Sequence, residues 1–106
     1  MSSREERIAK NEVIFREVNE RIRDVVPSEN GGIDFLCECG REDCVEQIPL
    51  TTAEYERVRA DPVQFFVKPG HAIKEVEEVI EENDRFLLVK KHVEEQEIAR
   101  RADPRA

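Results

Sequence analysis

The sequence has few of the residues from which large cores and common active sites are built. Its 106 residues include no tryptophan, one tyrosine, one methionine and two histidines. No apolar run approaches the roughly 20 residues that a membrane-spanning helix needs. A chain of this length buries only about 60–70% of the surface that its unfolded form exposes. These shortages exclude a membrane span and a multidomain enzyme, and they allow one modest core.

Sequence motifs of several common enzyme classes are also missing. There is no G-x-S-x-G, no glycine-rich loop to cradle a phosphate and no dinucleotide-binding fingerprint. The zinc deaminase pattern, which combines H-x-E with P-C-x-x-C, is absent as well. We therefore expect that the protein is not an enzyme.

Charge, by contrast, is abundant and unevenly distributed. Charged residues make up 40% of the chain, and the formal net charge is −8. The stretch from Arg4 to Asp24 is neutral, whereas the acidic excess lies downstream, much of it between Glu75 and Asp84, which we interpret as a solvated face. An acidic surface repels phosphate backbones and anionic membranes and favours basic protein partners.

The first residues are polar and charged, and they carry no apolar stretch like that of a signal peptide. We therefore expect a cytoplasmic protein in a reducing environment. Three cysteines in such a protein are interpreted as metal ligands or core thiols before they are interpreted as disulfides.

The three cysteines form the pattern C-x-C-x4-C, at Cys37, Cys39 and Cys44. Two thiols separated by one residue on a strand point the same way, so they can bind one ion together. Gly40 lets the backbone fold over that ion, and a turn after it can bring Cys44 back towards the other two thiols. A closed tetrahedral zinc site needs a fourth ligand.

His71 is the best candidate for this fourth ligand, because Pro69-Gly70 predicts a tight turn that holds it at a strand end. The sequence thus predicts a structural Cys3His site for Zn²⁺. Iron is an alternative metal, since sulfur-rich sites accept both, and His92 is a rival ligand. The cysteines could instead be buried core thiols, or a thiol-based redox or metal-responsive switch.

Residues 4–26 are predicted to form one amphipathic helix with a heptad pattern. This helix would either dock on the chain's own core or form a dimer or partner interface. The pattern consists of Ile8, Phe15 and Ile22, with Asn11, Val18 and Val25 three residues behind. Of these, we assign the partner surface to the face that bears Ile8, Phe15, Val18 and Ile22.

The rest of the chain predicts an α+β fold with a small antiparallel sheet, one short inserted helix and a short C-terminal helix. Thr51 and Glu54 fit a capping box that starts a helix ending near Ala60. Strands are expected at 33–39, 44–49, 63–67, 76–82 and 86–89, and a helix at 93–102. Residues 73–82 also fit helix spacing, but the turn signal that follows favours a strand at 76–82. The predicted units are the helix 1–26, a linker 27–32, a zinc-binding unit 33–93 and a tail 94–106.

Two functions remain open beside an interaction or regulatory module with structural zinc. One is the thiol-based switch, and the other is a nucleic-acid-binding zinc module. Basic residues that could gather near the site support the latter, namely Arg57, Arg59, Lys68 and Lys74. The net charge and the lack of interleaved basic and aromatic residues argue against nucleic acid.

Nearly the whole chain carries one further pattern, from the helix at 11–22 to Asp103-Pro104-Arg105. Its most specific segments are Phe35-Leu36-Cys37-Glu38-Cys39-Gly40, Cys44, Ile48-Pro49-Leu50-Thr51, Glu54-Tyr55, Val58-Arg59, Pro62, Phe65 and Pro69-Gly70-His71. This pattern resembles a family of small bacterial proteins of unassigned function with a C-E-C-G…C…P-G-H signature. The resemblance implies that the cysteines and His71 belong to one shared site, and it implies no activity.

Overall fold

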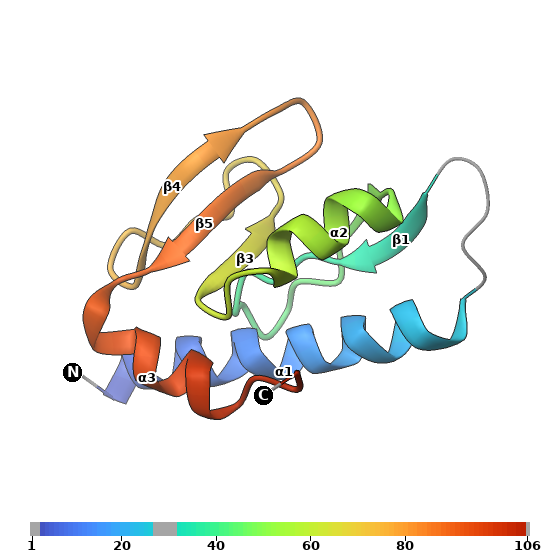
Figure 1. Ribbon diagram of the computed structural model, residues 1–106. Helices are drawn as coiled ribbons and strands as arrows, with labels where there is room; N and C mark the ends of the chain where they lie inside the picture. The colour runs from blue at the N-terminus through green and yellow to red at the C-terminus, as the bar shows by residue number, and fades with distance from the viewer. Residues whose placement is uncertain (1–2, 27–31, 106) are drawn as a thin grey trace.

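A computed structural model describes residues 3–26 and 32–105, and within these ranges it contains three helices and five strands (Figure 1). The predicted α+β class is confirmed. Residues 27–31 of the predicted linker lie outside the described ranges. The elements are α1 (Ser3–Val25), β1 (Ile33–Leu36), β2 (Gln47–Leu50), α2 (Thr52–Arg59), β3 (Gln64–Val67), β4 (Glu77–Glu82), β5 (Leu87–Lys91) and α3 (Val93–Arg101).

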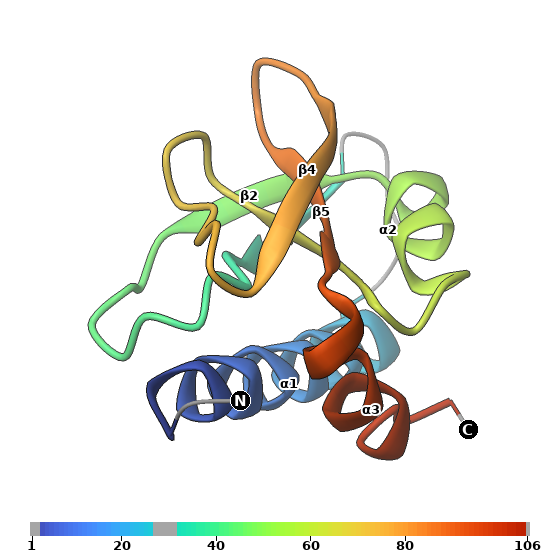
Figure 2. The same ribbon diagram turned by 90° about the vertical axis from the view of Figure 1, so that its left-hand side faces the viewer.

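The strands form two small antiparallel sheets rather than the single sheet that the sequence predicted. β1 pairs with β2, and the other three strands lie in the order β3-β5-β4. The chain after β1 joins the two sheets, because the Glu38 N–H donates to the Phe66 carbonyl over 3.0 Å. The helices α1 and α3 lie on one side of both sheets (Figures 1 and 2).

Two predicted strand boundaries were wrong, and both concern the cysteine segment. The strand expected at 33–39 ends at Leu36, and the strand expected at 44–49 starts at Gln47. A left-handed backbone at Gly40, with φ of +75°, turns the chain away from an extended path. The cysteines therefore lie on a connecting loop between β1 and β2.

The predicted capping box at the start of α2 is confirmed. The Glu54 N–H donates to the Thr51 hydroxyl over 3.1 Å, and the Thr51 N–H donates to the Glu54 carboxylate over 2.9 Å. α2 places Tyr55 in the core, where its ring stacks on Phe35 with centroids 4.3 Å apart. Phe66 packs edge-on against both rings.

The heptad pattern does not define the buried face of α1. Val18 and Val25 are 38% and 76% exposed, whereas Glu12, Arg16 and Asn19 are buried. The Arg16 guanidinium explains part of this docking, since it donates to the carbonyls of Pro62 and Ala99 over 2.7 Å each. The helix is thus held by polar contacts as well as by apolar residues such as Ile8 and Ile22, and hydrophobic periodicity does not report the polar contacts.

The acidic run at 75–84 is also not uniformly solvated, because Glu77 is buried. Its carboxylate accepts a hydrogen bond from the Lys91 ammonium over 2.8 Å, and Lys91 also contacts the buried Glu12 of α1. The rest of the run on β4 is exposed. Within the described ranges, no helix combines the length and apolar character needed to cross a membrane.

Candidate metal centre

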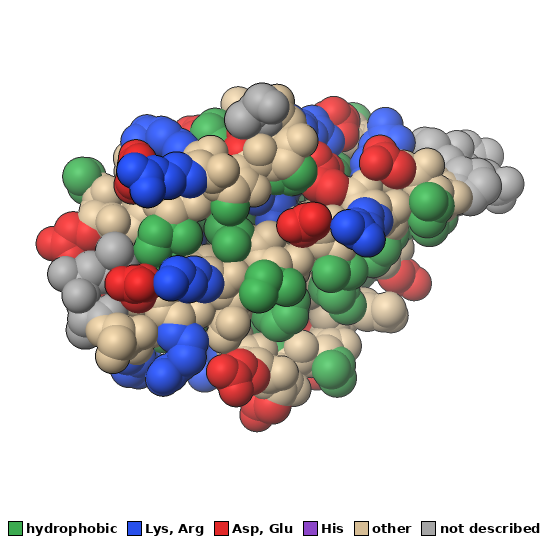
Figure 3. Space-filling model, turned by 90° about the horizontal axis from the view of Figure 1, so that it is seen from below, with side chains coloured by type: hydrophobic (Ala, Val, Ile, Leu, Met, Phe, Trp, Pro, Cys, Tyr) green, Lys and Arg blue, Asp and Glu red, His purple; other side chains and the backbone are tan. Residues whose placement is uncertain are grey.

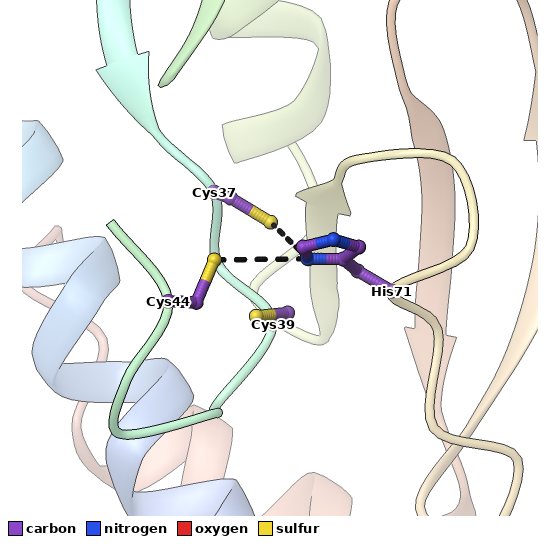
Figure 4. Close-up of side chains that lie close together, drawn as sticks. All are labelled: Cys37, Cys39, Cys44 and His71. Carbon is purple, nitrogen blue, oxygen red and sulfur yellow. Dashed lines mark hydrogen bonds between the residues drawn. The ribbon is translucent and has the colours of Figure 1, made fainter. Parts of the chain in front are cut away.

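The four predicted ligands meet at one point between the loop after β1 and the loop after β3 (Figure 4). Their ligand atoms, from Cys37, Cys39, Cys44 and His71, all lie within 4.8 Å of one another. The three cysteines are free, with no disulfide among them. The sequence therefore identified a group of residues that the fold brings together.

The loop of residues 37–46 is shaped so that its three thiols converge. At its ends, the Cys37 N–H donates to the Glu46 carbonyl over 2.9 Å. At its tip, the Cys44 N–H donates to the Arg41 carbonyl over 3.1 Å, which closes the predicted turn. This turn returns Cys44 to the cysteines at the loop's start.

His71 is held by the predicted turn at Pro69-Gly70. Its backbone N–H donates to the Lys68 carbonyl over 2.9 Å, and Gly70 has a φ of +87°, which glycine adopts at no steric cost. The turn carries the imidazole across to the cysteine loop, where Nδ1 faces two of the thiols (Figure 4). Sequence reasoning thus found the member of the cluster that is most distant along the chain.

The distances in this cluster suit a tetrahedral zinc ion. His71 Nδ1 lies 3.6 Å from the Sγ atoms of both Cys37 and Cys44. Zinc bonds of about 2.3 Å to sulfur and about 2.0–2.1 Å to nitrogen, at tetrahedral angles, place such atoms about 3.5–3.6 Å apart. The donor set and these two distances are compatible with a tetrahedral metal ion.

The environment shifts the pKa values of the three thiols in different directions. A hydrogen bond from Cys37 lowers the pKa of Cys39 to about 5. The same hydrogen bond, followed by burial, raises the pKa of Cys37, and burial raises the pKa of Cys44. Metal binding to such a group displaces the remaining thiol protons, because thiolates are the ligands.

The cluster is enclosed on one side and open on the other. Cys37 and Cys39 are buried, whereas Cys44 and His71 are partly exposed. These last two residues line a surface hollow of about 400 Å³, together with Gly70 and the loop at 41–46. An ion would therefore enter past Cys44 and His71 and meet the buried thiols behind them.

The loop is supported from α1 by residues that the sequence did not single out as part of the site. Asn19 donates to the Leu36 carbonyl over 3.0 Å and accepts from the Leu36 N–H over 2.8 Å. Asn11, a heptad position in the sequence, donates to the Gly40 carbonyl over 3.1 Å. The amide side chains of α1 thus hold the backbone before Cys37 and after Cys39.

Glu38, between the first two cysteines, points away from the cluster and into a buried network. It accepts from Asn19 over 2.8 Å and contacts Arg59, and both carboxylate and guanidinium are buried. Burial raises the pKa of Glu38, while Arg59 and then Asn19 oppose that rise. Alternate residues of an extended segment point to opposite sides, so Glu38 faces away from the two cysteines that flank it. Its buried partner Arg59 is 21 residues away in sequence.

The rival residues lie elsewhere. His92 is exposed at the N-cap of α3 and is not among the clustered ligands. Of the basic residues that could gather near the site, Arg59 is in the core and Arg57 pairs with Glu81 over 2.7 Å. Burial of Arg59 removes it from any surface that could meet a phosphate backbone.

In comparisons with known proteins, no family model, curated protein or solved structure matches this chain. The resemblance to the bacterial C-E-C-G…C…P-G-H family therefore remains a prediction from the sequence.

Proposed function

We propose that this protein is a small zinc-binding interaction module in which Cys37, Cys39, Cys44 and His71 hold a structural Zn²⁺. The observation that carries the proposal is the 3.6 Å spacing of His71 Nδ1 from two thiols, with the third cysteine in the same cluster. Three thiolates and one imidazole complete a tetrahedral site and leave no position for water or substrate. The proposed role of the ion is therefore structural and not catalytic.

The irregular loop that carries the cysteines is the segment that such an ion would stabilise. Residues 37–46 contain no regular secondary structure, yet they place two buried cysteines beside α1. In a small protein a structural metal supplements a limited core. We propose the cytoplasm as its compartment, since a reducing environment keeps the three free thiols available to the metal.

The proposed contact surface for a protein partner is the outward face of α1. Of the residues that the sequence assigned to it, Ile8 is buried and Ile22 packs against the core. The exposed apolar residues are instead Ile14, Val18 and Val25, at 56%, 38% and 76%. Seen from the side of α1 and α3, hydrophobic side chains lie scattered among charged ones (Figure 3).

A second copy of this chain is the occupant that we propose for this face. The three residues follow one another at intervals of four and seven, which is the spacing by which helices pair along a shared seam. The segment from Arg4 to Asp24 carries no net charge, so two copies of α1 would not repel each other through their overall charge.

Metal content per chain tests the zinc proposal. We expect about one zinc per chain in the wild-type protein purified under reducing conditions without added metal, by elemental mass spectrometry. His71→Ala and Cys39→Ser should lose the metal, because a closed site needs all four ligands. His92→Ala is the matched control and should keep it. Absence of metal from the wild-type protein would contradict the proposal and favour core packing or redox chemistry as the role of the cysteines.

A further inference from the structure

A second group of chemically reactive side chains lies where α3 begins, and the zinc proposal makes no use of it. Glu95 is only 1% exposed, and neither of its carboxylate oxygens has a hydrogen-bond partner among the described residues. A buried charge without a partner costs several kcal/mol or forces a proton onto the group. Either a proton or a cation must therefore compensate this carboxylate.

The position of Glu95 in its helix does not explain its burial. It is the third residue of α3, the position from which a glutamate reaches back to the N-cap backbone. Here the N-cap residue is His92, and its N–H already donates to the Val76 carbonyl over 2.8 Å. The Glu95 carboxylate therefore does not cap the N-terminus of α3.

Two other carboxylates converge on the same point. One ligand oxygen each from Glu5, Glu94 and Glu95 lies within 4.8 Å of the other two. Glu5 comes from the first turn of α1, and Glu94 and Glu95 come from the first turn of α3. These turns can meet because both helices begin at the same end of the molecule (Figure 1). Burial, then Glu94, then Glu5 raise the pKa of Glu95.

The nearby cations do not form hydrogen bonds with the buried Glu95 carboxylate in the described part of the chain. The Lys91 ammonium contacts Glu12 and Glu77, and no hydrogen bond joins it to Glu95 in the described residues. His92 and Lys91 lower the pKa of Glu95 less than burial and the two carboxylates raise it. Three carboxylates thus face one another with no positive side chain bonded to the buried one.

We propose that Glu5, Glu94 and Glu95 form a second metal site, for a hard divalent cation of the size of Ca²⁺. All three donors are oxygen, which hard cations prefer and which differs from the sulfur-rich cluster at Cys37. Oxygens on opposite sides of Ca²⁺ lie about 4.6–5.2 Å apart, whereas those around Mg²⁺ lie at most about 4.2 Å apart. The three oxygens lie within 4.8 Å of one another, so they can reach one Ca²⁺ ion together.

The bound ion would join the first turn of α1 to the first turn of α3. Glu94 is exposed and Glu5 is partly exposed, so water completes the coordination shell on the outer side. A site with three carboxylates and several waters is expected to bind Ca²⁺ with a Kd of about 10⁻⁴–10⁻³ M. The site shares no residue with the Cys3His cluster, so an experiment can contradict one metal site without contradicting the other.

Calorimetric titration of the full, zinc-loaded chain with Ca²⁺ tests the proposal. We expect one Ca²⁺ per chain in the wild type and weaker binding of Mg²⁺. Glu95→Gln should abolish Ca²⁺ binding, whereas Glu97→Gln should retain it. The Glu97 variant removes the same charge from the same helix at an exposed position, where Glu97 pairs with Arg101.

Ca²⁺ is the probe because it does not compete for thiolates, and zinc content measured on each variant shows that the fold is intact. Glu94→Gln, a change at an exposed residue, provides a second test and should weaken binding. No Ca²⁺ binding by the wild type at millimolar concentration would overturn the proposal and leave Glu95 protonated. Unchanged binding by Glu95→Gln would equally overturn it.

Discussion

Gly40 shows how one residue couples the cysteine loop to α1. Its φ is +75°, and a Cβ atom there would lie 2.8 Å from the Ile8 carbonyl oxygen and 2.9 Å from Glu12 Cγ. The same residue receives a hydrogen bond from Asn11 at its carbonyl. Only glycine allows both the left-handed turn beside Cys39 and this close approach of the helix.

Gly40→Ala should therefore destabilise the fold more than Gly70→Ala. Both substitutions place alanine at positive φ, which costs about 1–2 kcal/mol. At Gly70 nothing lies within 4 Å of the added Cβ, whereas at Gly40 overpacking against α1 adds about 1–3 kcal/mol. Urea denaturation of the zinc-loaded variants measures the difference. Equal losses would mean that α1 does not press on this loop.

Replacing Glu38 should destabilise the fold more than its position between two cysteines suggests. Glu38→Ala leaves the buried Arg59 guanidinium without its carboxylate, and breaking a buried ion pair from one side costs about 3–5 kcal/mol. Glu81→Ala breaks the exposed pair with Arg57 and should change stability little. Chemical denaturation compares the two variants, and equal effects would contradict a buried role for Glu38.

At the level of whole elements, local signals predicted the fold well and long-range polar contacts were missed. The α2 capping box and the turn at Pro69-Gly70 are encoded within a few residues, and both formed as expected. The buried face of α1 was misjudged because Arg16 and Asn19 bond to backbone groups of distant segments. Sequence periodicity reports apolar burial, so it cannot reveal a helix that docks through guanidinium and amide groups.

Self-association through the outward face of α1 can be tested without disturbing the core. If α1 pairs with a second copy, replacing Val18 with glutamate should abolish the dimer, because it places two like charges in the seam. Light scattering measures the mass. Glu17→Gln, one residue away and exposed, is the control and should keep the dimer. A monomeric wild type at all concentrations would contradict self-association.

Across the whole molecule, the sequence predicted the four ligands of the candidate centre but not what holds them. Cysteine spacing and a turn before His71 are visible in the chain itself, whereas the supports come from α1, at least 17 residues from the loop in sequence. The same holds for the buried charges at Glu77 and Lys91, which resemble surface residues until the fold places them together. Acidic composition alone could not separate these buried carboxylates from the solvated ones on β4.

The distribution of the core predicts that zinc removal loosens the molecule locally instead of unfolding it. Cys37 and Cys39 share a core with Phe35, Tyr55 and Phe66, but those three rings also pack directly on one another, and β5 is paired on both sides. The cysteine loop, in contrast, depends on few backbone hydrogen bonds. After chelation, hydrogen exchange should therefore accelerate at residues 40–46 and 70–72, while the amides of β5 stay protected. The thermal midpoint should fall, because the metal binds the folded state preferentially. Exchange that is unchanged throughout would contradict a structural ion, and loss of protection in β5 would show that the ion holds the whole fold.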